Sequence, residues 1–150
     1  MRTGREALVF VSRSSERGKE VLLTHRCPKL GGFWHAVAGG AEKDEDGEAA
    51  AKRELLEETG LEAGGKFDSR RHSYSYPLSE VPPVRRALYT PGTQRISVEC
   101  FRIGAPTDWE PVLNWEHDAY RWCGVGEALA LLRWPTVSEA LIALSRASKD

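Results

Sequence analysis

Three glutamates in the segment Arg53–Leu61, RELLEETGL, constrain this chain more strongly than any other feature. A helix turns by about 100° per residue, so Glu54, Glu57 and Glu58 fall within about a third of its circumference. Carboxylates on one stripe repel each other unless a cation lies among them. Oxygen-rich clusters favour hard divalent ions, which indicates Mg²⁺ or Mn²⁺ rather than zinc. The segment therefore predicts a helix that presents a metal site to a cleft.

Small and apolar residues accompany these acids on the same helix. Ala50 lies one turn before them and leaves room for a metal ion and its phosphate. Leu55 and Ala51 lie on one flank of the acidic stripe, and Leu56 and Ala49 lie on the other. We therefore expect apolar contacts on both flanks to anchor the helix.

A bare Glu-x-x-Glu-Glu sequence is also common on solvated helix faces, where it pairs with ordinary arginines. Here Arg53 lies four residues before Glu57 and can hold that carboxylate. The longer spacing argues for more than a solvated face. The full pattern reads Gly39, five residues, Glu45, seven residues, Arg53-Glu54-Leu55, one residue, Glu57-Glu58, one residue, Gly60-Leu61. Its chance occurrence is on the order of one in ten million at average residue usage.

This pattern resembles the Nudix box over its full 23 residues. The resemblance implies an α+β fold, an α/β/α sandwich in which the box forms a loop–helix–loop beside a mixed sheet. It implies a pyrophosphohydrolase that uses water without a covalent enzyme intermediate. The implied metal ligands are Glu54, Glu57 and Glu58, of which Glu57 and Glu58 are catalytic. The implied structural positions are Gly39, Glu45, Arg53 and Gly60. Asp44 departs from a common glycine, which we expect to alter a loop and not the metal site.

The segment Trp115–Trp122, WEHDAYRW, resembles a Glu-His-x-Ala-Tyr-x-Trp segment of the bacterial dihydroneopterin triphosphate pyrophosphatase branch. In that branch the glutamate contributes to the metal site or acts as a base. The resemblance therefore implies that Glu116 is a further metal ligand and catalytic residue; a structural loop acid is the alternative. Phe33-Trp34, Pro91-Gly92 and the terminal helix after Trp134-Pro135 fit the same layout. Residues 77–90 are longer than expected of that branch, which leaves its substrate open.

Basic and aromatic residues are candidates for binding the substrate. Arg26 ends a predicted strand, where Nudix enzymes often present an arginine to phosphate. The other candidates are Trp34, Arg85, Arg86, Tyr89 and Arg95, and a solvated loop surface is an equal alternative for the arginines among them. The expected substrate is a small nucleotide-like di- or triphosphate, either dihydroneopterin triphosphate or a nucleoside triphosphate. A dinucleoside polyphosphate, a nucleotide sugar and a non-catalytic nucleotide-sensing module are the alternatives.

Composition limits the remaining possibilities. A chain of 150 residues suits a single domain over residues 1–150, and a net charge of −1 indicates neither nucleic-acid nor membrane binding. No run of 18 apolar residues exists and Met1–Arg5 lacks a signal-peptide pattern, so we expect a cytoplasmic protein, monomeric or homodimeric. Cys27, Cys100 and Cys123 match no disulfide or zinc spacing and predict small buried side chains. The four histidines show no ligand spacing.

The remaining segments predict a mixed sheet covered by helices. We expect strands over residues 7–11, 21–24, 33–37, 96–100 and 119–125, an extended stretch over 66–76, and a long loop over 77–92, which holds four prolines. Asp44 or Asp46 caps the central helix, and Gly60 ends it. Thr136 and Glu139 match a capping box at the start of a terminal helix. The apolar face of that helix is Val137, Ala140, Leu141 and Leu144.

Overall fold

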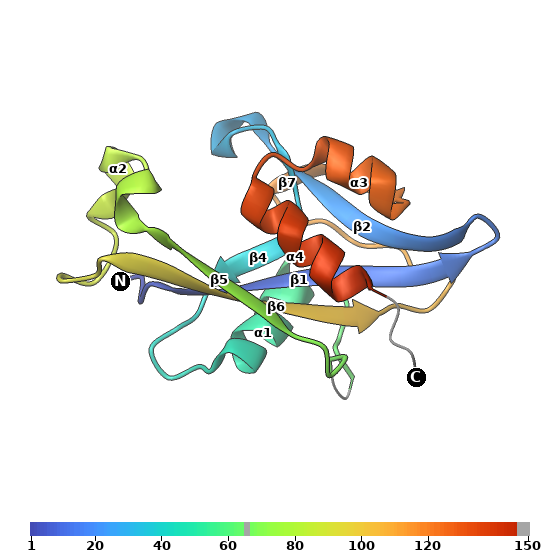
Figure 1. Cartoon of the computed structure of the whole chain (residues 1–150), viewed down its shortest axis with the longest axis horizontal. Coiled ribbons are helices and arrows are strands. Elements are labelled where there is room, and N and C mark those ends of the chain that lie inside the picture. Colours follow the sequence, from blue (N-terminus) through green and yellow to red (C-terminus); the bar gives the residue numbers. More distant parts are fainter. Residues whose placement is uncertain (65–66, 147–150) are drawn as a thin grey trace.

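A mixed sheet of seven strands forms the centre of the computed structural model, which describes residues 1–64 and 67–146 (Figure 1). The strands are β1 (Arg5–Ser15), β2 (Gly18–Arg26), β3 (Trp34–His35), β4 (Val37–Gly40), β5 (His72–Pro77), β6 (Arg95–Gly104) and β7 (His117–Cys123). The main strand order is β3-β2-β1-β6-β5, with β4 paired to β1 and β7 paired to β2. β1 and β6 are parallel, and the other pairs are antiparallel.

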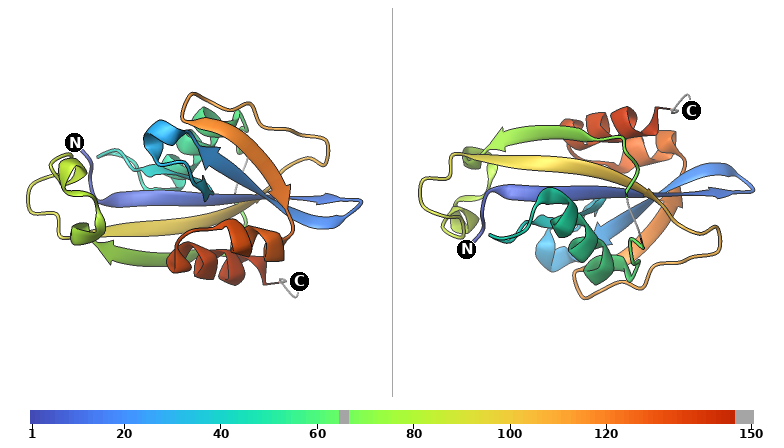
Figure 2. Two further views of the ribbon diagram at one scale, coloured as in Figure 1. Left: turned by 90° about the horizontal axis from the view of Figure 1, so that it is seen from above. Right: turned by 90° about the horizontal axis from the view of Figure 1, so that it is seen from below.

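Helices cover both faces of this sheet. They are α1 (Gly47–Thr59), α2 (Pro83–Arg86), α3 (Val125–Leu131) and α4 (Pro135–Ser145), with short 3₁₀ turns at η1 (Pro28–Leu30) and η2 (Leu78–Glu80). α1 lies against one face, and α3 and α4 lie against the other, as the two opposite views of Figure 2 show. The α/β/α sandwich expected from the box is thereby confirmed.

The continuous apolar run in β1 follows from this layered arrangement, because a central strand is buried on both faces. Leu8 and Phe10 belong to the core on the side of α3 and α4. Ala7, Val9 and Val11 belong to the core on the side of α1. β1 thus contributes alternate residues to two separate cores.

The ends of α1 follow the local sequence. Of the two candidate caps, Asp46 is the N-cap, and its carboxylate accepts a hydrogen bond from the amide of Ala49 at 2.8 Å. Gly60 ends the helix with φ of 81°, a left-handed conformation that glycine adopts without strain. The predicted anchoring on both flanks is wrong: Leu55 is buried, whereas Leu56 on the other flank is 49% exposed. The sheet covers only one side of the helix, so the second flank faces solvent.

Two strand predictions needed correction. The expected strand over 33–37 is divided into β3 and β4, because the chain passes from pairing with β2 to pairing with β1 at Ala36. The expected strand over 119–125 begins earlier, at His117, and ends at Cys123. α3 then begins at Val125, and its seven residues are too few for a clear helical period.

The capping-box prediction for the terminal helix is wrong, although its buried face is as expected. Pro135 occupies the first turn, so Trp134 becomes the N-cap and Thr136 lies inside the helix.

In the expected extended stretch 66–76, β5 covers residues from His72 onward, and Lys66 lies outside the described residues. The expected loop 77–92 contains η2 and α2, and backbone hydrogen bonds join Arg2 to Leu88 and Thr90.

The cysteines are all free; Cys100 and Cys123 are buried, whereas Cys27 is only partly so. Among the described helices, none combines the length and apolar character needed to cross a membrane.

Candidate active site

A cleft of about 840 Å³ opens on the sheet face that carries α4. Its floor includes the end of β4 from Ala38 to Gly40, and one wall comes from β5 and the η2–α2 loop. Seen from above, α2 lies near the N-terminus and α4 lies farther along β5 (Figure 2). Glu54 and Glu57 of α1 and Glu116, which precedes β7, also line the cleft.

Gly39 explains how a helix on the opposite face delivers carboxylates to this cleft. The carboxyl group of Glu54 occupies the position that a Cβ atom at residue 39 would take. Any side chain there would displace Glu54, so the first glycine of the box is required by close approach and not by its φ angle.

Arg53 holds the loop before α1 against the helix. Its guanidinium group donates to both carboxylate oxygens of Glu45, at 2.7 and 2.8 Å, and to the carbonyl of Gly40 at 2.9 Å. Hydrogen bonds from Arg53 lower the pKa of Glu45 to about 2. Arg53 also contacts Glu54 at 2.8 Å, whereas its contact with Glu57 is 3.4 Å. The main partner of Arg53 is therefore Glu45 and not Glu57, which the sequence predicted.

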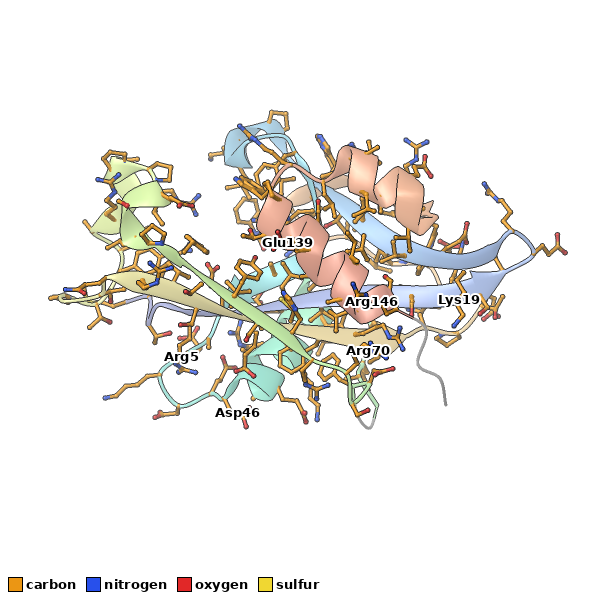
Figure 3. All side chains as sticks on the ribbon, in the orientation of Figure 1. Arg5, Lys19, Asp46, Arg70, Glu139 and Arg146 are labelled. Carbon is orange, nitrogen blue, oxygen red and sulfur yellow. The ribbon has the colours of Figure 1, made fainter. Side chains whose placement is uncertain are left out.

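The same loop is tied to the sheet by Arg5. Its guanidinium group donates to the carbonyls of Glu45 and Glu42 at 2.8 and 3.0 Å. Figure 3 shows Arg5 on the same side of the sheet as Asp46 at the start of α1. These bonds keep the box loop close to β1 and β4.

The three box glutamates have very different surroundings. Glu58 is 1% exposed, and its Oε1 has no hydrogen-bond partner among the described residues. Burial raises the pKa of the Glu58 carboxyl, and the neighbouring Glu54 and the charge of Glu116 raise it further. Glu57, by contrast, has a side chain that is 54% exposed. The buried end of the cluster therefore disfavours the charged form of Glu58 unless a cation is present.

Glu116 lies at this cluster although it is 58 positions beyond Glu58 in the chain. Asn114 donates to its Oε1 at 3.0 Å and accepts from its backbone amide at 3.2 Å. The carbonyl of Glu116 accepts from the amide of Cys27 at 2.9 Å, which ties this loop to the end of β2. Two other acids close to Glu116 in the sequence have partners of their own: Glu110 bonds to Arg13, Tyr120 and Trp122, and Asp118 pairs with His25.

His117 lies beside Glu58, with Nε2 3.5 Å from Oε1, but the pair is not a conventional ion pair. Burial lowers the pKa of His117, and its Nδ1 is 3.0 Å from Oδ1 of Asn114. A neutral His117 that donates from Nδ1 leaves Nε2 unprotonated toward Glu58. Asn114 was not among the residues predicted from the sequence, although asparagine often accepts a hydrogen bond from the backbone amide two residues later, as Asn114 does from Glu116.

These residues fit a hard divalent cation. In the described part of the chain, no three His, Cys, Asp or Glu side chains already converge as metal ligands. The available donors are nevertheless carboxylates, and one buried oxygen of Glu58 lacks a partner among like charges. A cation at Glu54, Glu57, Glu58 and Glu116 would relieve that repulsion.

Arg26 lines the cleft and acts on the acidic cluster through its charge. Its Nε is buried and has no hydrogen-bond partner among the described residues. Its charge lowers the pKa of both Glu58 and Glu6, which places it within electrostatic reach of both ends. A guanidinium group with unused donors suits a phosphate oxygen.

The other substrate-binding candidates divide into two groups. Arg85 and Tyr89 line the cleft. Arg86 lies outside the lining because it donates to the carbonyls of Val81 and Ser79 within its own loop. Arg95 bonds to Ser75 on the exposed edge strand, and Trp34 packs against His25 and is not among the residues that line the cleft. Strand alternation instead turns Phe33 and His35 into the cleft.

The fold and site together define an α/β/α protein whose acidic helix reaches a cleft that is also lined by Arg26. The chain matches the family model of the NUDIX domain over residues 2–144 and therefore belongs to the NUDIX family.

Other proteins are similar to this chain in sequence or in structure. An octanoyltransferase of Myxococcus xanthus is 35% identical over 127 residues, which cover 83% of this chain and 32% of that protein. The chain thus spans about a third of the length of this curated relative. The dihydroneopterin triphosphate pyrophosphohydrolase of E. coli is similar in structure, with a TM-score of 0.75, 24% identity and 93% of each chain covered. A C. elegans Ap4A hydrolase has a TM-score of 0.75, 19% identity and 94% of each chain covered.

Proposed function

We propose that this NUDIX hydrolase cleaves a pyrophosphate bond in a small nucleotide-like di- or triphosphate, using Mg²⁺ or Mn²⁺ held by Glu54, Glu57, Glu58 and Glu116. The observation that carries the proposal is the buried carboxyl group of Glu58, which lies among like charges without a hydrogen-bond partner for Oε1 among the described residues. Such an arrangement is unfavourable for folding alone and favourable once a cation is present.

A bound divalent cation would neutralise phosphate charge and make the attacking water more acidic. Arg26 would bind the phosphates through its unused donors and hold them beside the box glutamates. Asn114 already engages Oε1 of Glu116, and no described residue donates to Oε2. Glu116 Oε2 is therefore the atom that we assign to accept the proton of the attacking water.

The leading substrate is a triphosphate cut to release pyrophosphate, with dihydroneopterin triphosphate or a nucleoside triphosphate as the head-group classes. The fold shared with the E. coli pyrophosphohydrolase supports this choice. A dinucleoside polyphosphate or nucleotide sugar is the second candidate. The size of the cleft favours it, and so do the packed aromatic rings of Phe33 and Trp134, which line the cleft. A purely sensing module is less consistent with a box that keeps every glutamate.

The test is a product analysis with Mg²⁺ present. Dihydroneopterin triphosphate, a nucleoside triphosphate, diadenosine tetraphosphate and a nucleotide sugar are incubated with the protein, and the products are resolved by chromatography. We expect pyrophosphate and an organic monophosphate from a triphosphate. Orthophosphate as the sole phosphorus product would refute the cleavage position, and no hydrolysis of any compound would refute the function. A preference for the dinucleoside compound would establish the second candidate.

A further inference from the structure

Glu6 is a carboxyl group on the cleft floor that neither the box nor the metal site requires. It lies on β1, and it shares a sheet face with the core residues Leu8 and Phe10. The hydroxyl of Tyr76 donates to its Oε1 at 3.0 Å, and no described residue donates a hydrogen bond to Oε2. A carboxylate accepts about four hydrogen bonds, so most of the acceptor capacity of Glu6 remains unused.

Aromatic rings and arginines surround this carboxyl group. Tyr74, Tyr76 and Tyr89 line the same cleft as Glu6. Burial raises the pKa of Glu6, whereas the Tyr76 hydrogen bond and the charges of Arg2, Arg26 and Arg85 lower it. A partly buried carboxyl group with unused acceptor capacity favours a ligand that brings hydrogen-bond donors to it.

Glu6 lines the same cleft as the acidic residues Glu54, Glu57 and Glu116. Gly40, the direct partner of Glu6 in the β1–β4 pairing, also lines the cleft. It has no side chain that could fill the space beside Glu6. Arg26 lies within electrostatic reach of Glu6 at one end and of Glu58 at the other. A ligand with its ring at Glu6 would therefore have its phosphates at Arg26 and the box glutamates.

We propose that Glu6 is the specificity-determining residue of a head-group subsite and accepts two adjacent N–H donors from a 2-amino-4-oxopyrimidine ring, as found in guanine and pterins. The proposal deepens the proposed function and rests on it for the position of the phosphates. Two parallel donors match the two oxygens of a carboxylate, and Oε1 can accept one of them together with the Tyr76 hydroxyl. Tyr74 and Tyr89 supply apolar surface beside the ring.

This geometry discriminates between bases by their hydrogen-bonding edges. Guanine and pterin place a ring N–H beside an exocyclic amino group, so both carboxylate oxygens receive a donor. Adenine and cytosine place an amino group beside an unprotonated ring nitrogen, whose lone pair would face the carboxylate. Hypoxanthine keeps the ring N–H but lacks the amino group. A site that hydrogen-bonds a substrate group rejects analogues that lack the group more strongly than an apolar pocket does.

The first test needs no mutation. Initial rates with GTP, ITP and ATP are compared at saturating Mg²⁺, with dihydroneopterin triphosphate as a fourth compound. We expect kcat/KM for ITP and ATP to be lower than for GTP by roughly tenfold or more. Equal kcat/KM for GTP and ITP would overturn the role of Glu6 while leaving the proposed hydrolysis intact. No hydrolysis of any compound would instead refute the proposed function.

The second test uses Glu6→Gln, which keeps the shape of the side chain and replaces one acceptor oxygen with a donor. We expect kcat/KM for GTP to fall by roughly tenfold or more and that for ATP to change little, which removes the preference. The matched control is Glu16→Gln, which should keep the preference for GTP over ATP. Glu16 lies in the exposed turn between β1 and β2, and Figure 3 labels Lys19 at this end of the molecule. A Glu6→Gln protein with the native preference would contradict the proposal.

Binding provides a readout that does not depend on catalysis. Calorimetry with GMP, IMP and AMP in the presence of EDTA should give the tightest binding for GMP, and Glu6→Gln should abolish the difference. If the native protein binds the three monophosphates equally, Glu6 does not select the base. This measurement still tests the subsite when no triphosphate in the panel is hydrolysed.

Discussion

At the scale of single residues, the buried carboxyl group of Glu58 and its neighbours carry an energetic cost when no cation is present. The Glu58→Gln protein should therefore lose activity by at least about a hundredfold, because charge is removed where the metal is expected to bind. Its free energy of unfolding in EDTA should stay equal to that of the native protein or rise, because like-charge repulsion is removed. Initial rates and urea titrations measure the two effects. Glu48→Gln, on the same helix but paired with Lys52 and Arg71, is the control. Full turnover by Glu58→Gln would rule out the proposed site.

Glu116 and Asn114 make a second prediction at this scale. Glu116→Gln should lower kcat by about a hundredfold and change KM much less, because the carboxylate is assigned to the reacting water. Asn114→Ala should lower kcat to a smaller extent, because it only orients Glu116 through the 3.0 Å hydrogen bond. Steady-state kinetics over a range of substrate concentrations separate kcat from KM. A larger effect from Glu110→Gln than from Glu116→Gln would show that the wrong acid has been assigned.

At the scale of elements, the Glu45–Arg53 clamp joins the box loop to α1, and its contribution to stability depends on pH. The folded pKa of Glu45, about 2, lies below the ordinary value of 4.5. The stabilisation is therefore fully present above pH 4.5 and is lost as the pH falls from 4.5 toward 2. Glu45→Gln should reduce the free energy of unfolding at pH 7 by about 1–2 kcal/mol and flatten its pH dependence in that window. Chemical denaturation at several pH values measures both. An unchanged pH profile in Glu45→Gln would contradict this account.

The contact between β4 and α1 makes the second prediction at this scale. A Cβ atom at residue 39 would overlap the carboxyl group of Glu54, so Gly39→Ala should displace that side chain. We expect weaker Mn²⁺ binding and a loss of kcat of about tenfold or more, with secondary structure retained. Gly104→Ala is the matched control, because a Cβ there meets nothing within 4 Å. Electron paramagnetic resonance of Mn²⁺ and circular dichroism are the measurements. Native Mn²⁺ affinity in Gly39→Ala would show that Glu54 is not a ligand.

At the scale of the whole molecule, a single cleft brings acidic side chains of α1 together with arginines from other elements. The acids Glu54, Glu57 and Glu116 and the arginines Arg26 and Arg85 all line one cavity. A metal ion at the acids and a phosphate at the arginines should therefore bind cooperatively. We expect Mg²⁺ to lower the Kd of a non-hydrolysable nucleoside triphosphate by about tenfold or more, and Glu58→Gln to remove this coupling. Calorimetric titration with and without Mg²⁺ measures it. Equal Kd values in both conditions would show that the two ends act independently.

The sequence alone determined the family and the local structure of the box, because these depend on residues close together in the chain. The spacing from Gly39 to Leu61 predicted α1, its glycine stop and its acids, and the apolar run of β1 indicated a buried strand. The Glu116 segment predicted an acid that the fold brings beside Glu58, although its catalytic role remains a prediction.

Tertiary structure decided which side chains share the cleft. Glu6 lies more than sixty positions before Tyr74 and Tyr76, and their strands, β1 and β5, are joined only through β6, so no local pattern connects them. Strand alternation placed Phe33 and His35 in the cleft and Trp34 outside it, while hydrogen bonds within the structure withdrew Arg86 and Arg95. Glu45, and not Glu57, became the main partner of Arg53 because the box loop folds back onto the helix. Short-range spacing in the sequence specifies a helix and the charges on it. The direction in which each strand side chain points depends on which strands pair, and only the assembled sheet determines that pairing.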